Sequence, residues 1–224
     1  MKDPNEIRLA DLSNQSRMMG ESRSPSTNPL GEANGTFTPT DSIHGLIDLA
    51  KKVNIEDKVI AEVGCYLGVS TETFLLHKPK KMYAIDPWGV DLNYDESDGY
   101  LPDGGWGEIE QKFKERVGPY EEYTIIEIIK NTSIEAAKGF EENSLDFLYI
   151  DGNHEHSHVS ADIEAWWPKI KRGGYMGGHD FYVHTHPPEY TGVEATVYHY
   201  FGHEGHLNNH VESFSDSSWL FKKL

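Results

Sequence analysis

The chain has 224 residues, enough for one domain with a sizeable core, and a formal net charge of −17. This charge opposes binding to nucleic-acid phosphates and favours a small or neutral substrate, although acidity also serves solubility alone. The single cysteine, Cys65, excludes an internal disulfide and fits a reducing cytoplasm. The sequence contains neither an apolar run near the roughly 20 residues of a membrane span nor an N-terminal signal-peptide core.

Residues 1–40 are rich in Ser, Asn, Pro and Gly and show little periodicity. We therefore expect a flexible N-terminal arm there, with a lid that orders over the substrate as the alternative. Residues 41–224 are expected to form the folded domain, opening with a helix over residues 41–53 whose apolar side chains share one face.

Strands and helices are then predicted to alternate along the chain, which favours an α/β fold with a mainly parallel sheet. The predicted strands cover residues 59–64, 81–86, 124–129, 145–151 and 174–180, followed by a hairpin near 210–214 and 218–222. The predicted helices cover residues 70–76, 109–117, 134–140 and 193–201, and residues 91–107 read as a polar, glycine-rich loop. One more helix follows residue 151, because Val159, Ile163, Trp166 and Ile170 recur at helical spacing; Pro168 and Gly173-Gly174 are expected to end it.

A glycine loop, Gly64-Cys65-Tyr66-Leu67-Gly68, follows the first strand, and Asp86 ends the second strand 18 residues past Gly68. Such a layout is typical of a nucleoside-binding βαβ unit, in which a carboxylate accepts hydrogen bonds from ribose hydroxyls. Tyr66 stands where a dinucleotide site needs bare backbone beside the pyrophosphate. The loop therefore favours a nucleoside without a pyrophosphate, such as S-adenosylmethionine; a generic α/β turn is the alternative.

Three segments carry a family resemblance. Residues 62–70, EVGCYLGVS, resemble the first motif of catechol O-methyltransferases. Residues 150–154, IDGNH, and 177–181, GGHDF, resemble macrocin-type sugar O-methyltransferases and cephalosporin-hydroxylase-like proteins. From about residue 60 onward the chain is thus similar to class I S-adenosylmethionine-dependent methyltransferases. The resemblance implies a Rossmann-like α/β fold with a seven-stranded, mostly parallel sheet, a reversed last strand and helices on both faces.

The resemblance also implies a set of cofactor contacts. Around the methionine and ribose parts it implies Glu62, Gly64, Tyr66, Gly68, Ser70, Asp86 and Asp151. Ser133 follows the third strand, where related enzymes hold adenine. Trp88 could pack on the adenine face, with ordinary packing at the sheet edge as the alternative, and the alternative for Asp86 is a helix cap before Pro87.

A divalent metal is expected beside the cofactor. Family topology makes the strands that end at Asp151 and at His179-Asp180 neighbours about 4.8 Å apart, so these three side chains can converge on one ion. Mg²⁺ and Mn²⁺ are the expected ions. The imidazole weakens the magnesium assignment, because Mg²⁺ prefers oxygen ligands, and leaves Fe²⁺ or a plain hydrogen-bonded cluster as alternatives.

His154 is the expected general base. It lies three residues past Asp151, at the place of the base in the relatives, and a neutral imidazole with a reference pKa near 6.5 suits proton removal from a hydroxyl. Asp151 is the second expected catalytic residue, through its metal. His184, His186, Glu189 and Tyr190 are expected to shape the acceptor pocket.

The sequence therefore predicts a cytoplasmic, metal-assisted O-methyltransferase that uses S-adenosylmethionine on a hydroxyl of a sugar, polyol or phenol. Its expected partner is that small molecule, with neither nucleic acid nor membrane, and a homo-oligomer stays open. One alternative is a non-catalytic S-adenosylmethionine-binding protein or partner subunit. The other is a nicotinamide-dependent oxidoreductase, which Tyr66 in the glycine loop opposes.

Overall fold

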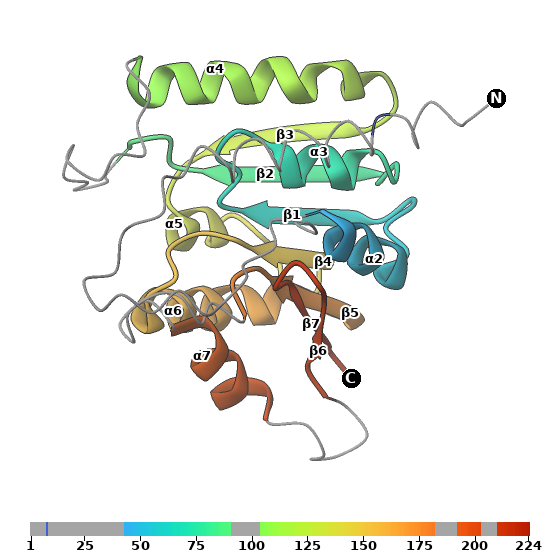
Figure 1. Cartoon of the computed structure of the whole chain (residues 1–224), viewed down its shortest axis with the longest axis vertical. Coiled ribbons are helices and arrows are strands. Elements are labelled where there is room, and N and C mark those ends of the chain that lie inside the picture. Colours follow the sequence, from blue (N-terminus) through green and yellow to red (C-terminus); the bar gives the residue numbers. More distant parts are fainter. Residues whose placement is uncertain (1–7, 9–42, 91–103, 182–191, 203–209) are drawn as a thin grey trace, which may run out of the picture.

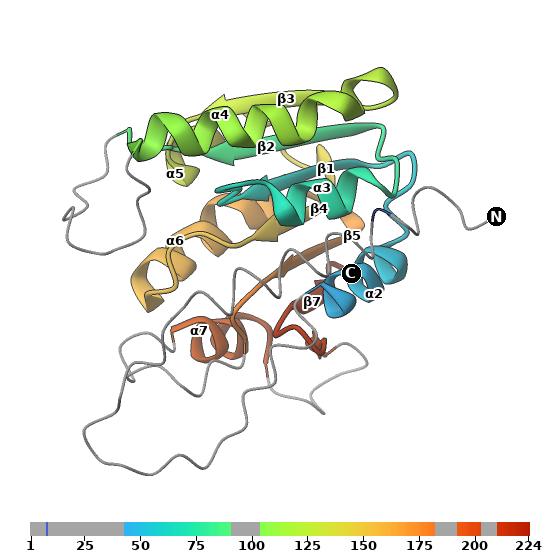
Figure 2. The same cartoon turned by 45° about the horizontal axis from the view of Figure 1, so that its top comes forward.

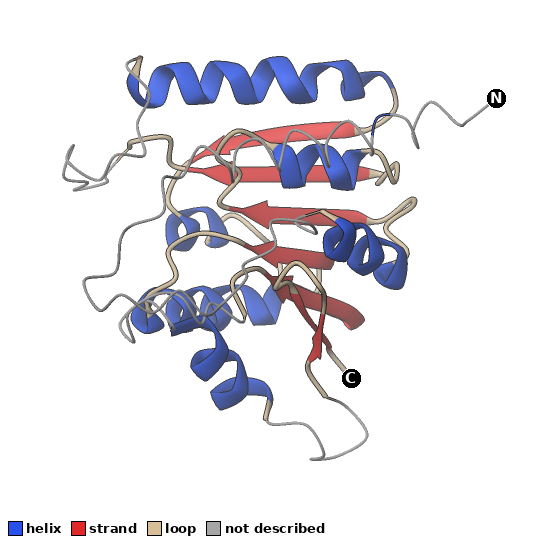
Figure 3. Cartoon of the chain, viewed as in Figure 1, coloured by secondary structure: helices blue, strands red, loops and turns tan. Residues whose placement is uncertain are grey.

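The structure, a computed structural model, describes residues 8, 43–90, 104–181, 192–202 and 210–224. Within these residues, seven strands form one sheet in the order β3-β2-β1-β4-β5-β7-β6 (Figures 1 and 3). Neighbours from β3 to β5 pair in parallel, whereas β7 runs antiparallel to both β5 and β6. The predicted sheet with a reversed last strand is confirmed. The strands are β1 (Val59–Val63), β2 (Lys81–Asp86), β3 (Ile125–Lys130), β4 (Leu145–Ile150), β5 (Ile170–Gly178), β6 (Glu212–Ser213) and β7 (Trp219–Lys222).

Helices cover both faces of the sheet (Figure 2). Successive side chains of a strand point to opposite faces, and β1 shows the result. Ile60 packs in the core beneath α2, α3 and α4, whereas Ala61 and Val63 pack in the core beneath α5, α6 and α7. The helices are α2 (His44–Val53), α3 (Val69–Leu75), α4 (Gly105–Val117), α5 (Ser133–Ala137), α6 (His156–Trp166) and α7 (Gly192–Phe201), with 3-10 turns η2 (Gly118–Glu122) and η3 (Trp167–Lys169).

The boundary between α6 and β5 differs from the prediction. Val159, Ile163 and Trp166 are buried on the sheet side of α6 as expected, but Ile170 is the first residue of β5. Pro168 ends the helix in the turn η3. The pair Gly173-Gly174, predicted to end the helix, lies inside β5 instead. Glycine at position 174 allows a close approach to β4, because a Cβ there would lie 2.8 Å from the Asp146 carbonyl oxygen.

The structure describes only part of several predicted segments. Helix α4 begins at Gly105, four residues before its predicted start at residue 109. Residues 91–103 of the predicted polar loop, the segment 184–190 expected at the acceptor pocket and all of the arm 1–40 except Arg8 lie outside the described residues. Within the described ranges, no helix combines the length and apolarity that a bilayer span requires.

Candidate functional site

The loop after β1 is closed by hydrogen bonds of its own backbone. The Gly68 N–H donates to the Cys65 carbonyl at 2.7 Å, and the Gly64 N–H donates to the Ile85 carbonyl of β2 at 2.9 Å. Both glycines have a positive φ, +87° at Gly64 and +79° at Gly68, which glycine adopts without strain. A Cβ on Gly64 would lie 2.1 Å from the Asp151 carbonyl oxygen, so the loop touches the end of β4 through a position that only glycine can fill.

Glu62 supports this loop from below. It is fully buried on β1, and its carboxylate accepts hydrogen bonds from the Ser70 hydroxyl and, at 2.5 Å, from the Thr71 hydroxyl. Burial raises its pKa to about 8, against the two hydroxyl hydrogen bonds, which lower it. In the described structure, Glu62 thus holds the first turn of α3, and its predicted contact with the cofactor stays a prediction.

Asp86 joins the loop to the end of β2. One carboxylate oxygen accepts the Tyr66 N–H at 2.9 Å, and the other accepts the Trp88 N–H at 2.8 Å. Burial raises the Asp86 pKa, and these backbone hydrogen bonds oppose the rise. A carboxylate offers about four acceptor sites, so Asp86 can accept from a ribose hydroxyl beside its backbone donors. Tyr66 itself is exposed, with φ of 46°, so its side chain stands on the surface of the loop.

Trp88 does not offer a face to adenine. Only 2% of it is exposed, its ring centroid lies 4.9 Å from that of Phe113, and its indole N–H donates to the Tyr66 carbonyl at 3.1 Å. The described conformation therefore favours the alternative, ordinary packing, over the predicted contact with adenine. The bulky indole finds more apolar contact in the core under α4 than at the sheet edge, and from there it holds the loop.

Ser133 lies at the start of α5, and its hydroxyl is engaged by protein groups. It donates to the Asp162 carboxylate at 2.5 Å and accepts the Trp166 indole N–H at 2.9 Å. Burial raises the Asp162 pKa to about 6, although the Ser133 hydrogen bond and the charge of His158 lower it. Sequence reasoning missed Asp162. The helical spacing could have identified it as a buried carboxylate, because Asp162 falls between Val159 and Trp166 on the apolar face of α6.

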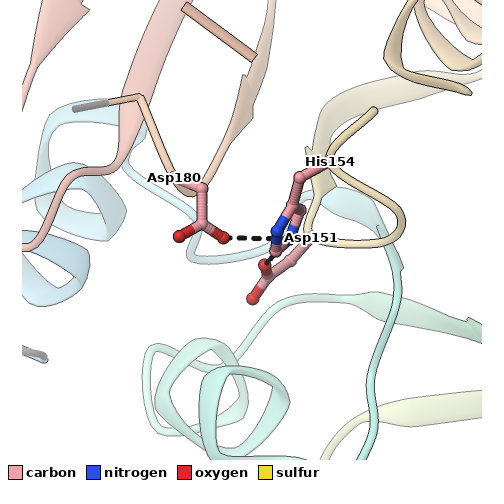
Figure 4. A group of neighbouring side chains, drawn as sticks. All are labelled: Asp151, His154 and Asp180. Carbon is pink, nitrogen blue, oxygen red and sulfur yellow. Dashed lines mark ion pairs between the residues drawn. The ribbon is translucent and has the colours of Figure 1, made fainter. Parts of the chain in front are cut away.

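Two carboxylates and an imidazole meet where β4 and β5 end (Figure 4). His154 Nε2 lies 2.9 Å from Asp180 Oδ2 and 3.7 Å from Asp151 Oδ1, and one ligand atom from each residue falls within 4.8 Å of the others. Among the described residues, this is the group of at least three potential protein ligands that could hold a metal ion. Carboxylate oxygens and a histidine nitrogen suit Mn²⁺ or Fe²⁺ and, less well, Mg²⁺.

His179, predicted as the third metal ligand, is not part of this group. Its Nδ1 lies 3.2 Å from Asp180 Oδ2, so it contacts one carboxylate but does not converge with Asp151. Asp180 turns out of the strand direction with a positive φ of 57°, so its carboxylate faces both His154 and His179, on different sides. His154, predicted as the base, takes the central place instead.

The charges in this cluster reinforce one another. Burial lowers the pKa of His154, but Asp151 and Asp180 outweigh burial and raise it to about 10. His179 follows the same pattern, and its pKa rises to about 9 through Asp180. The two imidazoles in turn hold the Asp180 pKa well below its usual range, against burial. The imidazolium groups of His154 and His179 are thus the counter-charges of the two carboxylates.

Two hollows lie at the amino ends of the strands, away from the glycine loop and the cluster of Asp151, His154 and Asp180. The larger, about 550 Å³, is lined by residues that precede β1, β2 and β3, among them Asp57, Lys78 and Tyr123. The smaller, about 150 Å³, lies beside Asp146 and Arg172. Neither contains a residue of the loop or the cluster. The chemistry-bearing residues gather instead at the carboxyl ends of the strands, where open α/β sheets bind their ligands.

A family model described as a methyltransferase domain matches residues 61–181, more than half of the chain. A curated protein of Sinorhizobium fredii, the uncharacterized protein y4gI, is 27% identical over 132 residues. The aligned region covers 57% of this chain but only 13% of that protein, so the chain spans a small part of the curated relative that it matches.

Solved structures of methyltransferases share the fold. A Staphylococcus aureus protein provisionally assigned as a caffeoyl-CoA O-methyltransferase has a TM-score of 0.59 at 14% identity, covering 99% of this chain and all of that one. The TDP-rhamnose 3′-O-methyltransferase CalS11 of calicheamicin biosynthesis has a TM-score of 0.54 at 11% identity, covering 99% and 96%. An rRNA methylase of Streptococcus thermophilus has a TM-score of 0.54 at 13% identity, covering 82% and 96%.

Proposed function

This chain belongs to the methyltransferase-domain family, and from that premise we propose that it transfers a methyl group from S-adenosylmethionine to a hydroxyl of a small molecule such as a sugar, polyol or phenol. One observation carries the proposal. The glycine loop and Asp86 lie at the same sheet edge as the cluster of Asp151, His154 and Asp180, and the Gly64 backbone touches the Asp151 backbone. A nucleoside site and an acid–base site are thus immediate neighbours.

Positioning is the main contribution of the protein. Methyl transfer proceeds in line, so the donor sulfur, the methyl carbon and the acceptor oxygen must lie on one line, and holding them there removes much of the barrier. In the proposed complex, the loop from Gly64 to Gly68 holds the methionine part and Asp86 accepts the ribose hydroxyls. Glu62, Ser70 and Thr71 keep the loop in shape through their hydrogen bonds.

His154 is the proposed acceptor of the hydroxyl proton. An alcohol is a poor nucleophile until it loses that proton, and a positioned base typically contributes roughly 10²–10⁴-fold to the rate. Asp180 and Asp151 orient the imidazole through contacts of 2.9 and 3.7 Å and stabilise its charge once it has taken the proton.

Asp151 and Asp180 are the proposed holders of a divalent cation, since an oxygen of each lies within 4.8 Å of the other and carboxylate oxygens bind such ions. A cation bound there would lower the pKa of the acceptor hydroxyl. It would also take over from the His154 imidazolium the role of counter-charge to the two carboxylates, leaving the imidazole neutral for proton removal.

Alternatives separate by simple observations. The rRNA methylase among the structural neighbours makes RNA a second substrate class to test, but the net charge of −17 disfavours it. A non-catalytic S-adenosylmethionine-binding protein would bind the cofactor without turnover. An oxidoreductase would bind a nicotinamide dinucleotide, which Tyr66 in the loop opposes.

Incubation with methyl-labelled S-adenosylmethionine and sugar, polyol and phenol libraries tests the proposal. We expect label in a small-molecule product, loss of turnover in chelator, and recovery with Mn²⁺ or Mg²⁺ in wild type but not in Asp151→Ala. His154→Ala should lower kcat by roughly 10²–10⁴-fold, whereas His156→Ala, an exposed histidine on the first turn of α6, should stay near wild type. Full turnover in chelator with no retained metal would contradict the metal role, and full activity of His154→Ala would contradict the base.

A further inference from the structure

A buried carboxylate outside the proposed catalytic site collects three donors. Glu72 on α3 is 1% exposed. Its Oε1 accepts from Arg8 Nε at 2.8 Å and from the Tyr120 hydroxyl at 2.6 Å, and its Oε2 accepts from Arg116 Nη1 at 2.7 Å. Arg8 Nη2 adds an ion pair at 2.7 Å. We call these four residues the Glu72 hub.

The hub joins segments that are far apart in the chain. Arg116 belongs to α4 and Tyr120 to the following turn η2, while Arg8 lies 64 residues before Glu72. The hydrogen bond to Glu72 raises the pKa of Arg8. Burial raises the pKa of Tyr120, and Glu72 adds to that rise, so both side chains keep their protons at neutral pH. Arg8 therefore docks on the domain as a charged hydrogen-bond donor, and it connects the N-terminal region to α3.

The hub also lies directly behind the glycine loop. The Glu72 N–H donates to the Gly68 carbonyl at 2.8 Å, so Glu72 is one helical turn past the last loop residue. A Cβ on Gly68 would lie 2.8 Å from the Phe113 ring and 3.3 Å from Arg116 Cδ. The Arg116 side chain, which pairs with Glu72, thus packs against Gly68 at the end of the loop. Movement of Glu72 would therefore displace Gly68.

Arg8 is the detachable member of the hub. Its side chain is 40% exposed, against 19% for Arg116. Two guanidinium groups face one carboxylate, so Glu72 keeps a cation and the Tyr120 hydroxyl when Arg8 leaves. Loss of Arg8 should therefore loosen the support of the loop without unfolding the domain.

We propose that Arg8 is a positioning residue for the cofactor loop: its docking on Glu72 favours the loop conformation that binds S-adenosylmethionine. This inference rests on the proposed function of the loop from Gly64 to Gly68. Coupling between two binding events is reciprocal, so cofactor binding must favour Arg8 docking by the factor by which docking favours binding.

Two measurements on the full chain test the coupling. Calorimetry with S-adenosylhomocysteine should show affinity roughly five- to tenfold weaker in Arg8→Ala, intermediate in Arg8→Lys, and within about twofold of wild type in Arg172→Ala, which removes an exposed guanidinium at the opposite sheet edge. Limited trypsin cleavage of the wild type, followed by mass spectrometry, should show slower cutting after Arg8 when S-adenosylhomocysteine is present. Cleavage after Arg172 in the same digest is the reference, because equal protection at both sites would report general stabilisation of the fold, whereas greater protection at Arg8 reports its docking.

Unchanged affinity in Arg8→Ala, with wild type binding normally, would overturn this inference and leave the proposed function intact. Cleavage after Arg8 at the same rate with and without S-adenosylhomocysteine would also overturn it, and that measurement decides the matter if Arg8→Ala fails to fold. Absence of binding by both wild type and Arg172→Ala would overturn the proposed cofactor site and this inference together.

Discussion

At the scale of single residues, carboxylates organise the site by holding the backbone as well as by facing a ligand. Asp86 fixes the N–H groups of Tyr66 and Trp88, and Glu62 fixes the hydroxyls of Ser70 and Thr71. The polypeptide around the loop is therefore shaped before a ligand arrives. Such preorganisation lowers the cost of binding, because fewer groups must be ordered at that moment.

Asp86→Asn tests this double role. The amide NH₂ would face a backbone N–H in place of an oxygen, and the ribose would lose a charged acceptor, so S-adenosylmethionine affinity should fall by about tenfold or more, as expected for a charged hydrogen bond worth about 1.5–3 kcal/mol. Calorimetry measures the loss. Glu127→Gln, which removes an exposed carboxylate on β3, is the control and should bind normally. Unchanged affinity in Asp86→Asn, or tight NAD binding by wild type, would contradict the assignment.

Asp162 predicts a pH-dependent stability. Its folded pKa of about 6 lies above the ordinary 3.8, so between these values the native state binds more protons than the unfolded chain. The free energy of unfolding should therefore fall as pH rises from about 4 to 6, and Asp162→Asn should not share this fall. Urea titrations at pH 4 and 7 should show the variant gaining about 1–3 kcal/mol relative to wild type between the two. Parallel stabilities would mean that the buried carboxylate is not the cause.

At the scale of elements, each active group comes from the end of a parallel strand. β1 leads into the glycine loop, β2 ends at Asp86, β4 leads to Asp151 and β5 to Asp180. The sheet brings together residues that are more than a hundred positions apart in the chain. The close packing of the loop against the end of β4 is the tightest of these arrangements, and it depends on one glycine.

Gly64→Ala should therefore abolish cofactor binding and lower the melting temperature, because the new Cβ meets the Asp151 carbonyl oxygen at a strained positive φ. Gly107→Ala is the matched control. Gly107 lies inside α4 with open space around its Cα, so alanine should stabilise the protein by about 0.5–1 kcal/mol. Calorimetric binding and thermal melts of both variants check this. A Gly64→Ala protein that melts and binds like wild type would refute the close packing.

The sequence predicted the elements that short-range patterns determine, and it missed the features that depend on contacts between residues far apart in the chain. Apolar strands and glycine turns identified the sheet and the loop, whereas Gly173-Gly174 looked like a helix end because the close approach of β5 to Asp146 is not visible in the sequence. Likewise, the spacing brought His179 and Asp180 to the same end of the strands without giving the directions of their side chains, so His154, and not His179, joins the two carboxylates. Arg8 could not be matched to Glu72, since no local pattern links residues 64 positions apart.

At the scale of the whole molecule, charge separates the two substrate classes found among the structural neighbours. A net charge of −17 repels polyanions that come within the screening length of the salt, which is about 8 Å at physiological ionic strength. We therefore expect no measurable binding to ribosomal RNA fragments by fluorescence anisotropy at about 0.15 M salt, and none at lower salt, where repulsion grows. Submicromolar binding that weakens as salt rises would revive RNA as the substrate.

The position of β7 in the sheet bears on how the protein is made. β7 (Trp219–Lys222) follows every other strand in the chain, yet it lies between β5 and β6. Until residue 222 has left the ribosome, β5 therefore keeps a bare edge along Tyr175–Gly178, the stretch that β7 later covers. Bare edges recruit other chains. Chains that stop before Trp219 are expected to aggregate, whereas the described part of the finished sheet ends on that side with the two-residue β6.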